Sequence, residues 1–137
     1  MALVTQLRRA AGLAKSAFIA DRAAAWLTDH AQATPAAADG CDRPLIIWTW
    51  HQQVAEAIAA ALAHHQVAAD RVGVITGATP GADRTRLCDA YQAGRLSLLV
   101  CSIPTVGVGV TLTRGCDAWM AETSWTPAEI SQAEDRQ

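Results

Sequence analysis

A continuous run of apolar residues at 45–50, LIIWTW, restricts the possible folds more than any other feature of the sequence. It follows a stretch at 33–44 that is rich in proline, glycine, aspartate and small residues, as loops are. A strand without polar alternation is covered on both faces, which is typical of a parallel sheet with helices on either side. The run therefore predicts a buried strand of an α/β sheet.

Strands and helices alternate along the rest of the chain. Helices are indicated by apolar residues that recur every three to four positions, and strands by short apolar runs. Alternation of this kind predicts right-handed crossovers and a parallel sheet flanked by helices on both faces. The predicted elements are helix 2–30, strand 45–50, helix 52–65, strand 72–75, helix 80–93, strand 96–101, strand 118–121 and a last helix from 126.

Several single residues are expected to set the ends of these helices. Gly12 predicts a kink or a break in the first helix. Thr79 is expected to cap the third helix, with Pro80 at its first helical position. Gly94 should end that helix, and the sequence TPAE at 126–129 fits a capping box.

The length of 137 residues fits one domain. We divide it into an N-terminal helical lead-in at 1–32, a loop at 33–44 and an α/β lobe at 45–137. Ligands of parallel α/β sheets bind at the carboxyl ends of the strands. The loops of interest therefore begin at Thr49, Thr76, Ser102 and Glu122. The last helix has barely begun at Gln137, so we expect the lobe to be truncated at its C-terminus.

Composition excludes several classes of protein. The net charge of −2 excludes a polybasic arm or a globally cationic nucleic-acid binder, but not a local groove lined by arginine. No apolar run reaches the ~18 residues that span a bilayer, so we expect a cytoplasmic protein with no membrane partner. The four cysteines form no C-x-x-C pair, which predicts ordinary thiols and no metal site. They are Cys41, Cys88, Cys101 and Cys116.

No complete active site is visible. The glycine-rich segment 77–84 lacks the spacing and the lysine of a phosphate-binding P-loop. Segment 107–112 begins like a dinucleotide fingerprint, but Leu112 occupies the position of the third glycine. Cys101 follows a buried strand, yet a phosphatase-type thiolate needs an arginine six residues later, where this chain has Gly107.

Two segments remain as candidate anion sites. Segment 102–111 offers hydroxyls, two glycines and a helix N-terminus, which together suit a phosphate. A simple tight connection is the alternative interpretation of the same residues. Gln132 and Arg136 lie four residues apart on one helix face and could reach a phosphate of a neighbouring lobe. An ordinary solvated helix face is the alternative for that pair.

Five blocks of the sequence fit the order and spacing of a known set of motifs. They are LRRAAGLAK at 7–15, the strand 44–51, TGAT at 76–79 with Arg84, segment 102–112, and AExxWxP at 121–127 followed by QAEDR at 132–136. With these blocks the whole chain resembles the second RecA-like lobe of a superfamily-two helicase. It is more closely similar to Swi/Snf-type DNA translocases, and among them to the HARP-type annealing helicases.

The resemblance implies a role for particular residues. ATP would be bound between this lobe and a separate first lobe, in cis or in trans, which carries the P-loop and holds Mg²⁺. Arg136 would be catalytic, and Gln132, Arg136 and Gly109 would face the nucleotide. DNA would be the second partner, contacted through its backbone. The DNA-contacting candidates are Thr49, Trp50, His51, Thr76, Gly77, Thr79, Ser102, Thr105, Gly107 and Trp125, with Gly109 beside them.

The sequence also departs from this family. Relatives continue past the first arginine of motif VI to a second arginine and a Gly-Gln pair, whereas this sequence ends at Gln137. Thr126 occupies a position where asparagine is common. The chain alone is therefore expected to hydrolyse no ATP. A stand-alone binding module that docks on a partner ATPase or on DNA is the alternative, and a nucleoid location would apply to a bacterial or phage protein.

Overall fold

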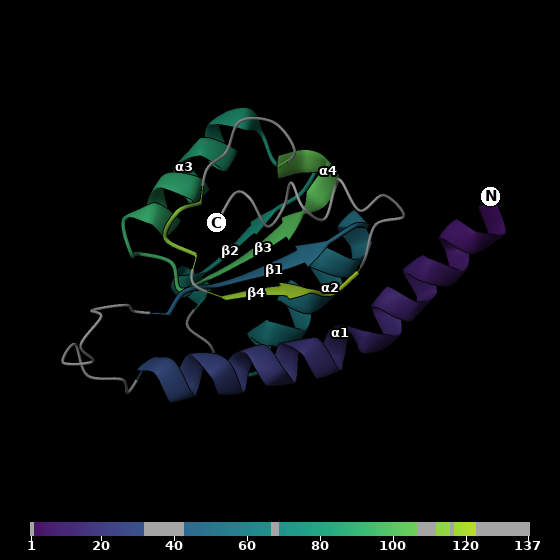
Figure 1. The fold of residues 1–137 in the computed structure, drawn as a ribbon, viewed down its shortest axis with the longest axis horizontal. Coiled ribbons are helices and arrows are strands. Elements are labelled where there is room, and N and C mark those ends of the chain that lie inside the picture. The colour runs from purple at the N-terminus through teal and green to yellow at the C-terminus, as the bar shows by residue number, and fades with distance from the viewer. Residues whose placement is uncertain (1, 32–42, 67–68, 107–111, 116, 123–137) are drawn as a thin grey trace.

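A computed structural model describes residues 2–31, 43–66, 69–106, 112–115 and 117–122. The elements alternate as predicted and build an α/β fold (Figure 1). They are helix α1 (Ala2–Ala31), strand β1 (Leu45–Thr49), helix α2 (Gln52–Ala63), the 3₁₀ turn η1 (Ala69–Arg71), strand β2 (Val72–Ile75), helix α3 (Gly81–Gln92), strand β3 (Leu98–Ser102), the short helix α4 (Ile103–Val106) and strand β4 (Asp117–Met120).

The four strands of the described residues form one parallel sheet in the order β2-β3-β1-β4. In this register Thr49 is opposite Ser102, and Trp48 is opposite Met120. All four carboxyl ends therefore lie at one edge of the sheet, where the sequence places the loops of interest.

Helices cover both faces of the sheet (Figure 1), which confirms the predicted fold class. Residues of β1 alternate between the two faces. Leu45 and Ile47 pack with α1 and α2, whereas Ile46 and Trp48 pack with α3. All five residues of β1 are buried, because hydrophobic side chains cover the strand from both sides.

The first helix corrects one part of a sequence expectation, the break that was the alternative to a kink at Gly12. Residues 2–31 form a single helix without a break at Gly12. Gly12 is buried instead, and a Cβ atom there would lie 2.8 Å from Cγ2 of Val54 and 2.9 Å from Oε1 of Glu122. The glycine thus permits α1 to approach α2 and the end of β4 closely, which is a packing role and not a helix-breaking role.

The start of α3 corrects a second expectation. The helix begins at Gly81 with Pro80 as its N-cap, and no side chain caps it. The Thr79 hydroxyl instead accepts a hydrogen bond from the Thr76 amide at 3.0 Å, within the turn that precedes the helix. The Gly94 prediction is confirmed, because this residue follows α3 with a positive φ of 78°.

Some expectations concern residues that the structure does not describe. The helix predicted from 126, the loop at 33–42 and residues 107–111 of the candidate anion segment lie outside the described ranges. Within those ranges, no helix is both long enough and apolar enough to cross a membrane.

Burial of three weakly acidic groups predicts a loss of stability at alkaline pH. Desolvation raises the pKa of the Cys101 thiol well above its ordinary value and also raises the pKa values of Cys88 and Tyr91. The unfolded chain ionises first as the pH rises, so it binds fewer protons than the folded chain. Stability is therefore full below about pH 8.5 and falls above it, by at most about 1.4 kcal/mol per pH unit for each thiol, with Tyr91 contributing only above about pH 10.

Urea unfolding at pH 7.5, 9 and 10.5 measures this dependence. The midpoint concentration should fall over the two upper steps. Cys101→Ala serves as the matched variant, because it removes one of the buried thiols and should flatten the dependence. A wild-type midpoint that stays constant up to pH 10.5 would contradict the prediction.

Candidate functional site

The carboxyl edge of the sheet brings the predicted DNA-facing loops together. Trp50 and His51 follow β1, residues 76–79 follow β2, and Thr105 lies in α4 directly after β3. Glu122 follows β4 at the same edge. Segments that are up to about seventy residues apart in sequence thus form one surface, because the strands are parallel.

Three of the predicted DNA-contacting residues are buried at this edge, namely Thr49, Thr76 and Ser102. The Thr49 hydroxyl donates to the Cys101 carbonyl, and the Ser102 hydroxyl donates to the Trp50 carbonyl, both at 3.3 Å. The Thr76 hydroxyl accepts a hydrogen bond from the amide of residue 78, also at 3.3 Å. These side chains hold the ends of the strands and the loops in place.

The remaining predicted contact residues within the described ranges are accessible. Gly77 is exposed, and Thr79 and Thr105 are partly exposed. A Cβ atom on Gly77 would lie 3.7 Å from Oγ1 of Thr105 and 3.8 Å from Oε1 of Gln52. The loops after β1, β2 and β3 therefore meet around Gly77, with the backbone of that residue open to solvent.

Arg84 fastens helix α3 to these loops. One terminal guanidinium nitrogen donates to the Thr79 carbonyl at 3.4 Å, and the other donates to the Thr105 carbonyl at 3.5 Å. The Nε atom of Arg84 is buried and has no hydrogen-bond partner among the described residues. This geometry favours a structural role for Arg84 over direct phosphate binding.

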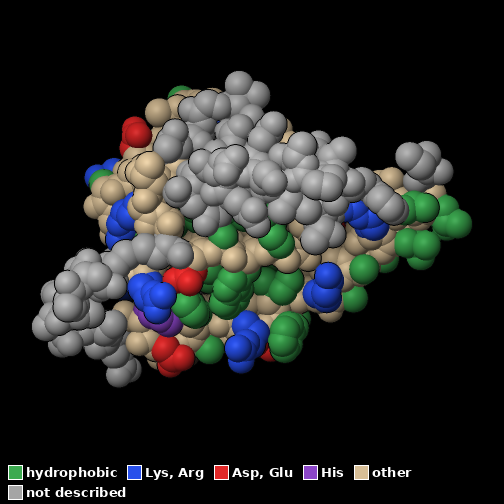
Figure 2. Space-filling view, in the orientation of Figure 1, with side chains coloured by type: hydrophobic (Ala, Val, Ile, Leu, Met, Phe, Trp, Pro, Cys, Tyr) green, Lys and Arg blue, Asp and Glu red, His purple; other side chains and the backbone are tan. Residues whose placement is uncertain are grey.

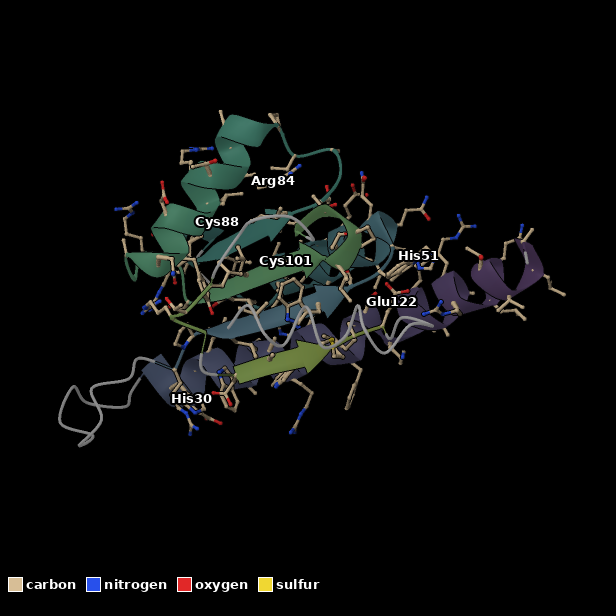
Figure 3. The ribbon with its side chains drawn as sticks, turned by 45° about the horizontal axis from the view of Figure 1, so that its top comes forward. His30, His51, Arg84, Cys88, Cys101 and Glu122 are labelled. Carbon is tan, nitrogen blue, oxygen red and sulfur yellow. The ribbon has the colours of Figure 1, made fainter. Side chains whose placement is uncertain are left out.

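Glu122 lies directly after β4 and binds the loop that follows β1 (Figure 3). Its Oε2 accepts hydrogen bonds from the amides of Trp50 and His51, each at 2.9 Å. Its Oε1 is 2.7 Å from Nδ1 of His51. The carboxylate is 7% exposed, so these three contacts lie in a site shielded from water.

Helix α1 lies against the same carboxylate. Gly12 faces Glu122 closely enough to exclude any side chain, and the Lys15 ammonium donates to the carbonyl of Ala121 at 3.3 Å. Farther along the helix, Asp21 pairs with His65 at the end of α2, with 2.6 Å between Oδ1 and Nε2. Helix α1 is thereby attached both to the candidate site and to α2.

Basic side chains do not gather into one patch on the visible face of the molecule. Figure 2 shows Lys and Arg as separate groups that are spread over this face. Some of them are paired with acids, such as Arg86 with Asp83 at 3.0 Å and Arg43 with Asp117 at 3.4 Å. This distribution agrees with the net charge of −2 and predicts few strong contacts to a polyanion.

The predicted nucleotide-facing residues lie outside the described ranges. These residues are Gln132, Arg136 and Gly109. The predicted DNA contacts Gly107 and Trp125 also lie outside the described ranges. Within the described part of the chain, no group of three or more His, Cys, Asp or Glu side chains could hold a metal ion.

Comparisons with known proteins found a curated relative of part of the chain and a solved structure with the same fold. No protein-family model matches the chain. A curated relative from Caenorhabditis elegans, a SWI/SNF-related matrix-associated actin-dependent regulator of chromatin subfamily A-like protein 1 homolog, is 38% identical over 86 residues. That match covers 54% of this chain and 12% of the relative, so the chain spans a small part of the relative's length.

A solved structure shows the same fold. The crystal structure of the C-terminal part of the Fun30 ATPase domain superimposes with a TM-score of 0.60 and 22% sequence identity, over 69% of this chain and 30% of that one. The fold is therefore an α/β RecA-like lobe. The sequence relative and the shared fold together support a C-terminal lobe of the superfamily-two, Swi/Snf type.

Sequence reasoning missed the contacts of two residues of this site, Glu122 and Gly12, although it marked Glu122 as the start of a loop and Gly12 as a kink or break of the first helix. A signal for Glu122 was present, because a lone carboxylate directly after an apolar strand at the ligand-binding edge needs hydrogen-bond donors. No comparable signal existed for Gly12, because its partners are more than forty residues away in sequence.

Proposed function

We propose that the chain is the second RecA-like lobe of an ATP-dependent, HARP-like DNA translocase. In this proposal the carboxyl edge of the sheet contacts the DNA backbone. ATP binds between this lobe and a P-loop-bearing first lobe, supplied in cis or in trans. Gln132, Arg136 and Gly109 face the nucleotide, Arg136 stabilises the transferring phosphoryl group, and the first lobe holds Mg²⁺.

The observation that carries the DNA half of the proposal is the surface around Gly77. Exposed backbone of Gly77 and partly exposed hydroxyl residues from two loops meet there. Backbone amides and hydroxyls are donors that suit phosphate oxygens, and such contacts position a strand without reading its bases. Because basic side chains are few and dispersed, the affinity of the lobe alone should be weak and should fall steeply with salt.

The test is DNA binding by Gly77→Glu. The glycine has no positive φ, and the nearest atoms to an added Cβ are 3.7 Å away, so the glutamate fits without strain. Its charge beside the phosphates should weaken binding of a labelled DNA duplex by about fivefold, from about 1 kcal/mol of repulsion. Fluorescence anisotropy at two salt concentrations measures the affinity.

Ala60→Glu is the matched control, because Ala60 is exposed on α2 two turns away from this edge. It adds the same charge and should leave the affinity nearly unchanged. Equal effects of the two variants would contradict the proposed surface, as would binding that survives high salt. ATP turnover by the purified chain above a Gln132→Ala, Arg136→Ala control would contradict the need for a P-loop lobe.

A further inference from the structure

We infer that Glu122 is a positioning residue, which holds the loop after β1 in the conformation that receives DNA. The inference rests on the proposed function and deepens it. It assigns a role to a buried acidic side chain that does not itself touch DNA. The loop concerned is 50–51, where both residues are predicted DNA contacts.

The hydrogen bonds of Glu122 are directed at the loop from one side. Two successive backbone amides, those of Trp50 and His51, point to the same oxygen at 2.9 Å. Bonds from amides to a buried carboxylate are stronger than bonds between neutral groups. On its other side the loop is held by Ser102, whose hydroxyl donates to the Trp50 carbonyl. The path of the backbone between β1 and α2 is thus fixed by two side chains from other strands.

The same carboxylate also orients the His51 ring. A carboxylate only accepts hydrogen bonds, so the 2.7 Å contact places a hydrogen on Nδ1 of His51. The other ring nitrogen, Nε2, is buried and has no hydrogen-bond partner within the described ranges. Removing the carboxylate frees the ring to change both its tautomer and its rotamer.

Helix α1 leaves the carboxylate little space to move. A methyl group on Gly12 would lie 2.9 Å from Oε1 of Glu122, which is closer than real side-chain contacts permit. Gly12→Ala therefore forces Val54 and Glu122, or helix α1 itself, to shift, while the carboxylate keeps its charge. This gives a second, independent way to disturb the same three hydrogen bonds.

The position of Glu122 in the sequence gives its contacts with Trp50 and His51 a further consequence. Glu122 directly precedes segment 123–137, which carries the predicted nucleotide-facing residues Gln132 and Arg136. Trp50 and His51 belong to the predicted DNA-facing surface. The Glu122 carboxylate therefore binds the predicted DNA-contacting loop at 50–51, and in the sequence it directly precedes the predicted nucleotide-binding segment 123–137.

The test compares DNA affinities of Glu122→Gln and Gly12→Ala with wild type. Loss of a negative charge by itself strengthens binding to a polyanion. Loss of positioning does the opposite, and we expect Glu122→Gln to bind DNA at least about fivefold more weakly. Asp89→Asn is the charge control, because Asp89 is exposed on α3, and its affinity should stay the same or rise. Loss of positioning lowers the DNA affinity and loss of a negative charge raises it, so the direction of the change distinguishes the two effects.

A stability control separates positioning from a general loss of structure. In Gly73→Ala the added Cβ would lie 2.8 Å from Cδ1 of Leu99 and 2.9 Å from Cδ1 of Leu96, within the core. This variant should have a lower Tm but wild-type DNA affinity. In wild type, ¹⁵N NMR of His51 should show the hydrogen on Nδ1, with slow exchange of the amides at 50 and 51. In Glu122→Gln the hydrogen should leave Nδ1 and the two amides should exchange faster, because one neutral amide oxygen replaces two carboxylate oxygens as the acceptor for three hydrogen bonds.

Each outcome decides the inference. Weaker DNA binding by both Glu122→Gln and Gly12→Ala, with undiminished affinity for the two controls, supports it. A folded Glu122→Gln that binds DNA as well as wild type overturns it. If Glu122→Gln fails to fold, two other results can overturn the inference. One is a Gly12→Ala variant that binds DNA with wild-type affinity. The other is an NMR spectrum of the wild-type protein in which His51 has no hydrogen on Nδ1. A wild-type chain that binds no DNA overturns the proposed function itself, and the inference with it.

Discussion

Trp48→Ala should lower the free energy of unfolding by about 3–5 kcal/mol. Trp48 is 1% exposed and lies in β1, on the face of the sheet that packs against α3. Truncation at Cβ removes the largest fully buried side chain of the described core and leaves a cavity beneath α3. For a chain of this length the loss corresponds to a fall in Tm of about 10–20 °C, which thermal unfolding followed by circular dichroism measures.

Trp48→Phe is the matched control for this prediction. The indole Nε1 of Trp48 is buried and no described residue bonds to it, so the variant removes an unsatisfied donor as well as part of the ring. Removal of the unsatisfied donor offsets part of the lost packing energy, so the free energy of unfolding should fall by less than about 2 kcal/mol. Comparable losses for the two variants would contradict the prediction that the volume of the side chain, and not the indole itself, sets most of the loss.

Ala23→Asp should be the second most damaging change, with a loss of about 3–5 kcal/mol. Ala23 is fully buried where α1 packs on α2, in the core cluster that also holds Ile58. A carboxylate at this position is desolvated among the hydrophobic side chains of that cluster. Urea unfolding measures the loss.

Ala25→Asp controls for the helix propensity of aspartate. Ala25 is two residues away on the same helix but is exposed, so the variant should lose less than about 1 kcal/mol. A large difference between the two variants would establish α1 as an integral part of the lobe core. Similar small losses would mean that α1 is a detachable extension.

The sequence was sufficient to predict the sheet, because burial on both faces leaves a direct signature in residues 45–50. The predicted strand at 72–75 coincides with β2, and the other strands differ by one or two residues at their ends. Those ends shift because hydrogen bonding to the neighbouring strand, and not the apolar run itself, decides where a strand stops. Thus Trp50 is apolar but lies beyond β1, where its amide donates to Glu122.

Features that depend on contacts between distant segments could not be predicted. The carboxylate of Glu122 is more than seventy residues from the amides that it binds. Gly12 has the same sequence context as a helix break, and only the approach of Val54 and Glu122 explains it. Thr79 fits an N-cap by its sequence, but its hydroxyl is used by the turn before the helix. In each case a tertiary contact decided between local alternatives.

For the candidate site, sequence reasoning placed the loops correctly but did not distinguish their exposed residues from their buried ones. Thr49 and Ser102 have the residue type of a phosphate ligand, yet burial directs their hydroxyls to carbonyl groups of the strands. Gly77 and Thr105 remain accessible because they lie beyond the strand ends. Whether any of them contacts DNA stays a prediction.

The strand order has a consequence for how the chain folds during synthesis. β1 pairs with β3 and β4, whose residues follow it by about fifty and seventy positions. On the ribosome, β1 therefore leaves the exit tunnel long before its partners exist, and its apolar residues remain uncovered for that time. Pairing across such long loops is slow, and unpaired apolar strands favour aggregation. The efficiency of folding should therefore depend on whether α1 and α2, which are synthesised around β1, shield it until β3 is made.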